Sequence, residues 1–163
     1  MLRRTAQVIK MKSRSNVLYF PTVAAPNLED VFARFLRDQQ RRLKPRTYRH
    51  YEEVIDLLRH CLNGYGYHEL NNSSDIALYE KLYFHKNLEF CVIFGPDKIL
   101  PSLSNFLNYF MIRKVMASEA LLQAAGTVTK KFIKWLEDSR YIDREQAIMG
   151  SRIAAEAARE LPA

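Results

Sequence analysis

From residue 27 onward, hydrophobic residues recur at the spacing of an α-helix. The clearest stripe repeats at intervals of three and four residues and comprises Tyr48, Tyr51, Ile55, Leu58 and Leu62. This spacing places the side chains on one helical face. Pro45 suits the first helical position, and Asn63-Gly64 supplies a stop signal. The pattern therefore predicts an amphipathic helix from Pro45 to about Leu62.

Similar stripes predict four other helices in the body of the chain. They run from Asn27 to near Gln40, from Ser73 or Ser74 to about Lys86, from Pro101 to Val115, and from Ser118 to about Ser139. Asn27 and Ser118 are good N-caps, because their side chains accept hydrogen bonds from free N–H groups of the first turn. The apolar run Phe90–Phe94 is too short for periodicity to choose between helix and strand, so the state of residues 87–100 stays open.

Two of these helices have apolar faces wide enough to cover each other. We expect one buried cluster from Val128, Phe132 and Trp135 on one helix and Tyr51, Ile55 and Leu58 on the other. Tyr48, Tyr51 and Trp135 alternate with basic residues as base-stacking aromatics do, but their spacing favours the core.

Residues 1–26 have a different pattern. Gln7–Met11 and Val17–Phe20 flank a polar turn and predict a short β-hairpin. The stretch is basic and free of acidic residues, so an organellar transit peptide is the alternative interpretation.

Residues 143–163 form an alanine-rich segment. Asp143 can cap a helix here, and the alanines favour one, but they provide little apolar bulk. Such a helix has to dock on something or fray, and the candidate contacts are a partner helix and a second copy of the chain. We therefore expect three parts: an N-terminal arm (1–26), a helical body (27–142) and this tail. The predicted fold is a mainly α, small SAM-like bundle of four to six helices with a short N-terminal β-hairpin.

The composition is that of one globular domain. With 163 residues and 48% hydrophobic residues the chain can bury a core, and 5 Gly and 6 Pro are too few for an all-β sandwich. No apolar run approaches the ~18 residues that a membrane span needs. Cys61 and Cys91 stand among apolar neighbours, which predicts free, buried thiols in a reducing cytoplasm.

The net charge of the chain favours a polyanionic partner. The chain has 25 Lys+Arg against 18 Asp+Glu, a net charge of +7. Two basic constellations stand out. Their members are Arg41, Arg42, Lys44, Arg46 and Arg49 at a helix junction, and Thr127, Lys130, Lys131 and Lys134 on one later helix. We expect both to contact DNA phosphates. The alternatives are a solvated linker for the first and an ordinary polar helix face for the second.

The residues around these constellations resemble a known family. The similarity lies in Lys44-Pro45-Arg46-Thr47-Tyr48 at a helix start and in the stretch from Thr127 to Leu136, followed by Tyr141-Ile142. Together they resemble the core-binding domain of tyrosine recombinases and phage integrases, across residues 27–142. That domain is a SAM-like bundle that clamps one face of duplex DNA, so the resemblance implies a DNA-binding module. The family's catalytic residues belong to a C-terminal domain without a counterpart here, so DNA cleavage is not implied.

The sequence contains no pattern of catalytic residues. Its histidines, His50, His60, His68 and His85, lack the spacing of metal ligands, and glycine-rich phosphate loops are absent. Glu52-Glu53 predicts a solvated helix face with charge pairs. We therefore expect a non-enzymatic protein without cofactor, metal, membrane or small-molecule substrate. The alternative to DNA binding is a helical assembly subunit whose tail pairs with a partner helix or a second copy.

Overall fold

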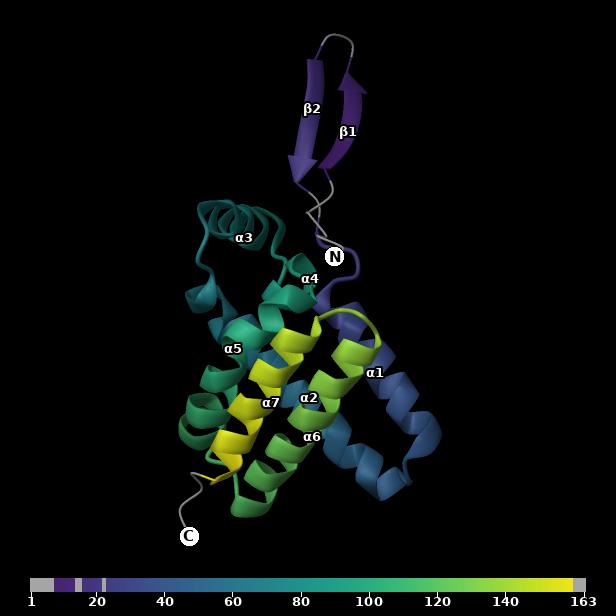
Figure 1. The fold of residues 1–163 in the computed structure, drawn as a ribbon. Helices are drawn as coiled ribbons and strands as arrows, with labels where there is room; N and C mark the ends of the chain where they lie inside the picture. Colours follow the sequence, from purple (N-terminus) through teal and green to yellow (C-terminus); the bar gives the residue numbers. More distant parts are fainter. Residues whose placement is uncertain (1–7, 14–15, 22, 160–163) are drawn as a thin grey trace.

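The computed structural model describes residues 8–13, 16–21 and 23–159 and is mainly helical, as predicted (Figure 1). Its α-helices are α1 (Leu28–Arg42), α2 (Pro45–Tyr65), α3 (Ser73–Lys86), α4 (Phe90–Ile93), α5 (Ile99–Asn105), α6 (Glu119–Asp138) and α7 (Arg144–Arg159). Two 3₁₀ turns and a π-helix join them: η1 (Gly66–Glu69), η2 (Pro96–Lys98) and η3 (Phe106–Lys114). Strands β1 (Val8–Ser13) and β2 (Asn16–Pro21) pair antiparallel, with Ser13 opposite Asn16. No helix in the described ranges is long and apolar enough to cross a membrane.

Side-chain caps confirm the starts predicted at Asn27, Ser118 and Asp143. Asn27 Oδ1 accepts a hydrogen bond from the Asp30 amide at 2.9 Å, and the Asp30 carboxylate accepts one from the Asn27 amide at 3.2 Å. This reciprocal capping box satisfies two N–H groups at the start of α1. Ser118 caps α6 through the Leu121 amide, and Asp143 caps α7 through the Gln146 amide at 2.8 Å.

Two other predicted starts are wrong. Helix α3 is capped by Asn72, whose Oδ1 accepts from the Asp75 amide at 2.8 Å, rather than by Ser73 or Ser74. Helix α5 begins at Ile99 rather than at Pro101.

Helices α1, α2 and α6 meet through aromatic rings. Phe35 of α1 is fully buried, and its ring centroid lies 4.8 Å from that of Phe132 on α6 and 5.9 Å from that of Tyr51 on α2. Phe132 also contacts Phe32 at 5.8 Å. Tilted and offset rings at these separations pack favourably. The cluster therefore holds α1, α2 and α6, which carry the candidate site residues, in fixed positions relative to one another.

The predicted burial of Trp135 is wrong. Phe132, Val128, Tyr51, Ile55 and Leu58 are buried together as expected, whereas Trp135 is half-buried. Its indole N–H donates to Asp38 Oδ2 of α1 at 2.9 Å. A buried tryptophan needs a partner for its N–H, and here that partner is a carboxylate at the protein surface. The ring consequently lies at the edge of the core.

Helix α2 continues to Tyr65, beyond the stop that Asn63-Gly64 was expected to provide. The Asn63 side chain does not cap the helix. Its Oδ1 accepts from the Cys91 amide at 2.9 Å, and its Nδ2 donates to Glu89 at 2.8 Å. These tertiary hydrogen bonds tie α2 to the segment 87–100, whose state the sequence left open. Within that segment Phe90–Ile93 forms the single helical turn α4, Pro96–Lys98 forms η2, and α5 begins at Ile99.

The alanine-rich helix α7 docks on this chain's own α5 and α6 (Figure 1). Ala147, Gly150 and Ala154 are buried in the contact. A Cβ atom at Gly150 would lie 2.7 Å from the Leu100 side chain and 3.0 Å from that of Ile133. The small residues that give α7 little bulk therefore allow close helix packing.

Both cysteines are free and buried, as predicted. Burial raises the pKa of Cys61 to about 12 and raises that of Cys91 further. Because the thiolate is the reactive form, both should react with a thiol reagent much more slowly in the native protein than in denaturant, at about pH 8. The measurement is thiol labelling followed by mass spectrometry. Rapid labelling of either native thiol would contradict the buried positions.

Candidate nucleic-acid interface

The first basic constellation forms a corner between two helices. Its residues, here called the basic corner, are Arg41, Arg42, Lys44, Arg46 and Arg49. The first two belong to the last turn of α1, and the last two to the first turns of α2, with Lys44 as the N-cap residue. All five are exposed. Because only two residues separate the end of α1 from the start of α2, the structure brings these cations together.

Most of the basic corner is unpaired. Arg42 donates from Nε and Nη2 to Gln39 Oε1, at 3.0 and 2.6 Å. Among residues 8–13, 16–21 and 23–159, no hydrogen bond or ion pair holds the charged groups of Arg41, Lys44, Arg46 or Arg49. Exposed cations without an internal partner remain available to a phosphate.

The helix dipoles distinguish the two halves of the corner. Arg41 and Arg42 complement the negative end of α1. Lys44 and Arg46, in contrast, lie at the positive end of α2, which has no acidic residue in its first turn and no side-chain cap. The free N–H groups and the added cations all favour an anion at this position. An external phosphate would supply the charge that this helix start lacks.

A stripe of arginines on α1, which the sequence analysis missed, extends this surface. Arg34, Arg37 and Arg41 are exposed and spaced three and four residues apart, which places them on one side of α1. Arg34 Nη1 donates to the Tyr141 hydroxyl at 2.8 Å. Their spacing relative to Arg41 is visible in the sequence, but the prediction for this helix rested on its apolar face alone.

The second constellation is divided by the packing of α6. Lys131 lies one turn before Trp135, whose ring contacts Phe35 of α1 at 5.4 Å, so Lys131 is on the α1 side. Lys130 and Thr127 instead line a groove between α6 and α7. Lys130 and Lys131 therefore lie on different sides of α6 and do not form one continuous basic face.

Lys134 differs from its neighbours because it is paired. Its Nζ lies 2.8 Å from Asp138 Oδ1 and 4.0 Å from Glu137 Oε2. The Glu137 carboxylate also receives Arg144 of α7 at 3.1 Å. These acids offset the charge of Lys134, so it is a weaker candidate for a phosphate contact than Lys130 or Lys131, which have no ion pair in the part of the chain that the structure describes.

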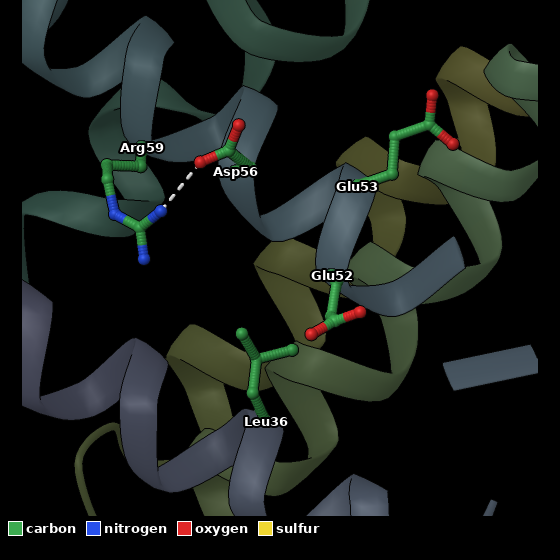
Figure 2. Close-up of a pocket in the computed structure, with 5 residues that line it drawn as sticks. All are labelled: Leu36, Glu52, Glu53, Asp56 and Arg59. Atoms are coloured by element: carbon green, nitrogen blue, oxygen red, sulfur yellow. Dashed lines mark hydrogen bonds and ion pairs between the residues drawn. The ribbon is translucent and has the colours of Figure 1, made fainter. Parts of the chain in front are cut away.

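An acidic groove borders the basic corner. Its lining consists of Leu36 of α1 and, from α2, Glu52, Glu53, Asp56 and Arg59 (Figure 2). Arg59 pairs with Asp56 at 2.7 Å and with Glu29 of α1 at 3.0 Å. Figure 2 shows the carboxylates of Glu52 and Glu53 pointing in different directions. These acids repel phosphates, so they limit the candidate surface to the other sides of the corner.

The histidines do not form a metal site. All four are exposed, and His60 Nδ1 lies 2.8 Å from the backbone oxygen of Asp56. Within the described ranges, no group of three or more His, Cys, Asp or Glu side chains is placed to hold a metal ion.

Comparison of the chain with protein-family models, curated proteins and solved structures finds no match.

Proposed function

We propose that this chain is a non-catalytic module that binds duplex DNA through the backbone phosphates. The observation that carries the proposal is the basic corner, in which four exposed cations without internal partners surround an uncapped helix start. The proposed role is that of a recombinase core-binding domain, the family that the sequence resembles. In that role, Lys and Arg contacts position the duplex but carry little sequence information.

Other cations widen the proposed contact surface. Lys131 lies on the side of α6 that packs against α1, and Arg37 lies one turn before Arg41 on α1. Lys130 and Thr127 contribute from the groove beside α7. The basic segment 1–26 acts as an arm along the duplex, since all of its charged residues are basic and lie within its first fourteen positions.

The proposal predicts binding that weakens steeply with salt. If Arg41, Lys44, Arg46 and Arg49 each neutralise one phosphate, log K should fall with log salt at a slope of at least roughly −3.6, since each contact contributes about −0.9. The measurement is fluorescence anisotropy of a labelled duplex of about 20 base pairs, titrated between ~50 and ~200 mM salt. Scrambling the duplex sequence should change affinity little.

A folded protein with no measurable affinity for the duplex at ~50 mM salt would refute the proposal, because phosphate contacts are strongest at low salt. A slope near zero would refute it as well, since the contacts would then not be ionic.

The second candidate is an assembly subunit. Ile148 and Met149 of α7 are 50% and 54% exposed, although the alanine face of α7 is covered by α5 and α6. If α7 mediates assembly, sedimentation should show a mass above the monomer that the Ile148→Ser/Met149→Ser double variant reduces. DNA binding would then be absent.

A further inference from the structure

A second surface, unrelated to the basic corner, lies on the π-helix η3. Tyr109, Ile112 and Met116 are exposed by 44%, 42% and 80%, and Met116 follows Ile112 by four residues, roughly one turn of a π-helix. Phe106 and Phe110 of the same helix are buried. We call the three exposed side chains, with Arg113 and Lys114 between them, the η3 face. Solitary exposed apolar residues are ordinary, but neighbouring ones mark interaction surfaces.

The backbone of the η3 face is unusual. The Val115 amide donates to the Phe110 carbonyl at 2.9 Å, five residues back, so the wide π-turn continues to the end of the helix. Such turns are rare and frequently occur at functional sites. Met116 follows with φ at 51°, in the left-handed region that favours glycine. A bulky apolar residue therefore occupies a strained position without being buried.

The Met116 side chain contributes little to the stability of the fold, although its backbone is strained. A glycine would adopt the same backbone more easily and would remove the exposed apolar side chain. With four-fifths of its surface exposed, the methionine makes few contacts within the chain. Methionine is common on surfaces that bind amphipathic helices, because its flexible thioether adapts to the partner.

Between the acidic residues Asp97 and Glu119, the charge of the chain that carries the η3 face is positive. No acidic residue occurs between Lys98 and Ser118, and Arg113 and Lys114 are exposed. The Lys114 ammonium lies 5.9 Å from the centre of the Tyr109 ring, so one of the two cations is next to an exposed aromatic side chain. A complementary partner combines apolar side chains with carboxylates.

We infer that the η3 face docks an acidic amphipathic helix of a partner protein. Apolar side chains of that helix cover Ile112 and Met116, and its carboxylates pair with Arg113 and Lys114. A second copy of this face is a poor occupant, because it would bring like charges together. Duplex DNA is a poor occupant as well, because Ile112 and Met116 cannot bond phosphates. The inference does not depend on DNA binding at the basic corner.

The test uses two synthetic amphipathic 18-residue peptides labelled with fluorescein, one built from Leu and Glu and the other from Leu and Lys. In fluorescence anisotropy with the full chain, the Leu/Glu peptide should bind at least tenfold more tightly. Met116→Gly and Arg113→Gln/Lys114→Gln should each weaken that binding at least fivefold. Met116→Gly should preserve the thermal midpoint, since it relieves strain, so loss of binding cannot reflect unfolding.

Matched controls separate this surface from others. Ile148→Ser/Met149→Ser removes comparable apolar exposure on α7, and Lys44→Glu/Arg46→Glu alters the basic corner, so neither should change peptide affinity. Equal affinity for both peptides, or no effect of Met116→Gly, would overturn the inference. Binding to vesicles of anionic phospholipid that Met116→Gly abolishes would also overturn it, because a membrane would then be the occupant. A dimer in sedimentation that Met116→Gly abolishes would overturn it as well, because a second copy of the chain would then be the occupant.

Discussion

Phe132→Ala should lower the free energy of unfolding by about 3–5 kcal/mol, as expected when a large aromatic side chain is removed from a packed core. The ring is fully buried and contacts Phe32, Phe35 and Trp135 on two helices. Removing it leaves a cavity where α1 meets α6, and neighbouring helices held by other contacts can close that cavity only in part. Urea denaturation followed by far-UV circular dichroism measures the loss.

Trp135→Ala is the comparison for this prediction. Its ring also contacts Phe35, but it is half-buried and its N–H bonds to the exposed Asp38. The substitution removes less buried area, so it should cost less than Phe132→Ala. A larger loss for Trp135→Ala, or an unchanged midpoint for Phe132→Ala, would show that the centre of the core lies elsewhere.

The helices that carry the fold were predictable because their signals are local. Asn27, Ser118 and Asp143 each cap the helix that the sequence assigned to them, and Pro45 begins α2. Capping depends on hydrogen bonds within one turn, and apolar stripes depend on the helical period alone. Neither requires knowledge of what a helix packs against.

The remaining features depend on tertiary contacts. Asn63 would commonly help to end a helix, but its side chain is used to bond Glu89 and Cys91, and α2 continues. In η3 the apolar stripe predicted an ordinary helix, and Phe106 and Phe110 are buried as that stripe implies. Residues four apart lie on one side of an α-helix and of a π-helix alike, so the apolar spacing does not distinguish the two kinds of helix.

The candidate site also combines features that the sequence shows directly with features that depend on packing. The basic corner follows from five cations within nine residues around a helix start, which the sequence shows directly. The division of Lys130 from Lys131 arises from packing, since α1 lies on one side of α6 and α7 on the other. The Lys134–Asp138 pair has the i, i+4 spacing of a helical ion pair, so the sequence could have shown that this charge is offset.

Lys44→Glu/Arg46→Glu should reduce affinity for duplex DNA at least about a hundredfold at ~50 mM salt, because two phosphate contacts are replaced by repulsion. Both residues lie at the positive end of α2, where acidic side chains are favourable. The double variant should therefore be as stable as the parent protein or slightly more so. Thermal unfolding of the variant checks that any loss of binding occurs in a folded chain.

Lys81→Glu/Arg152→Glu is the matched control, since it changes the net charge equally at exposed residues of α3 and α7 that have no ion pair in the described ranges. If affinity reflects only net charge, both double variants should bind equally weakly. If the corner holds phosphates, the control should retain most of the affinity, and the Lys44/Arg46 variant should also show a shallower salt slope, reduced by about 1.8 for two lost contacts. Equal losses in the two variants would contradict a localised site, because long-range charge alone would then explain binding.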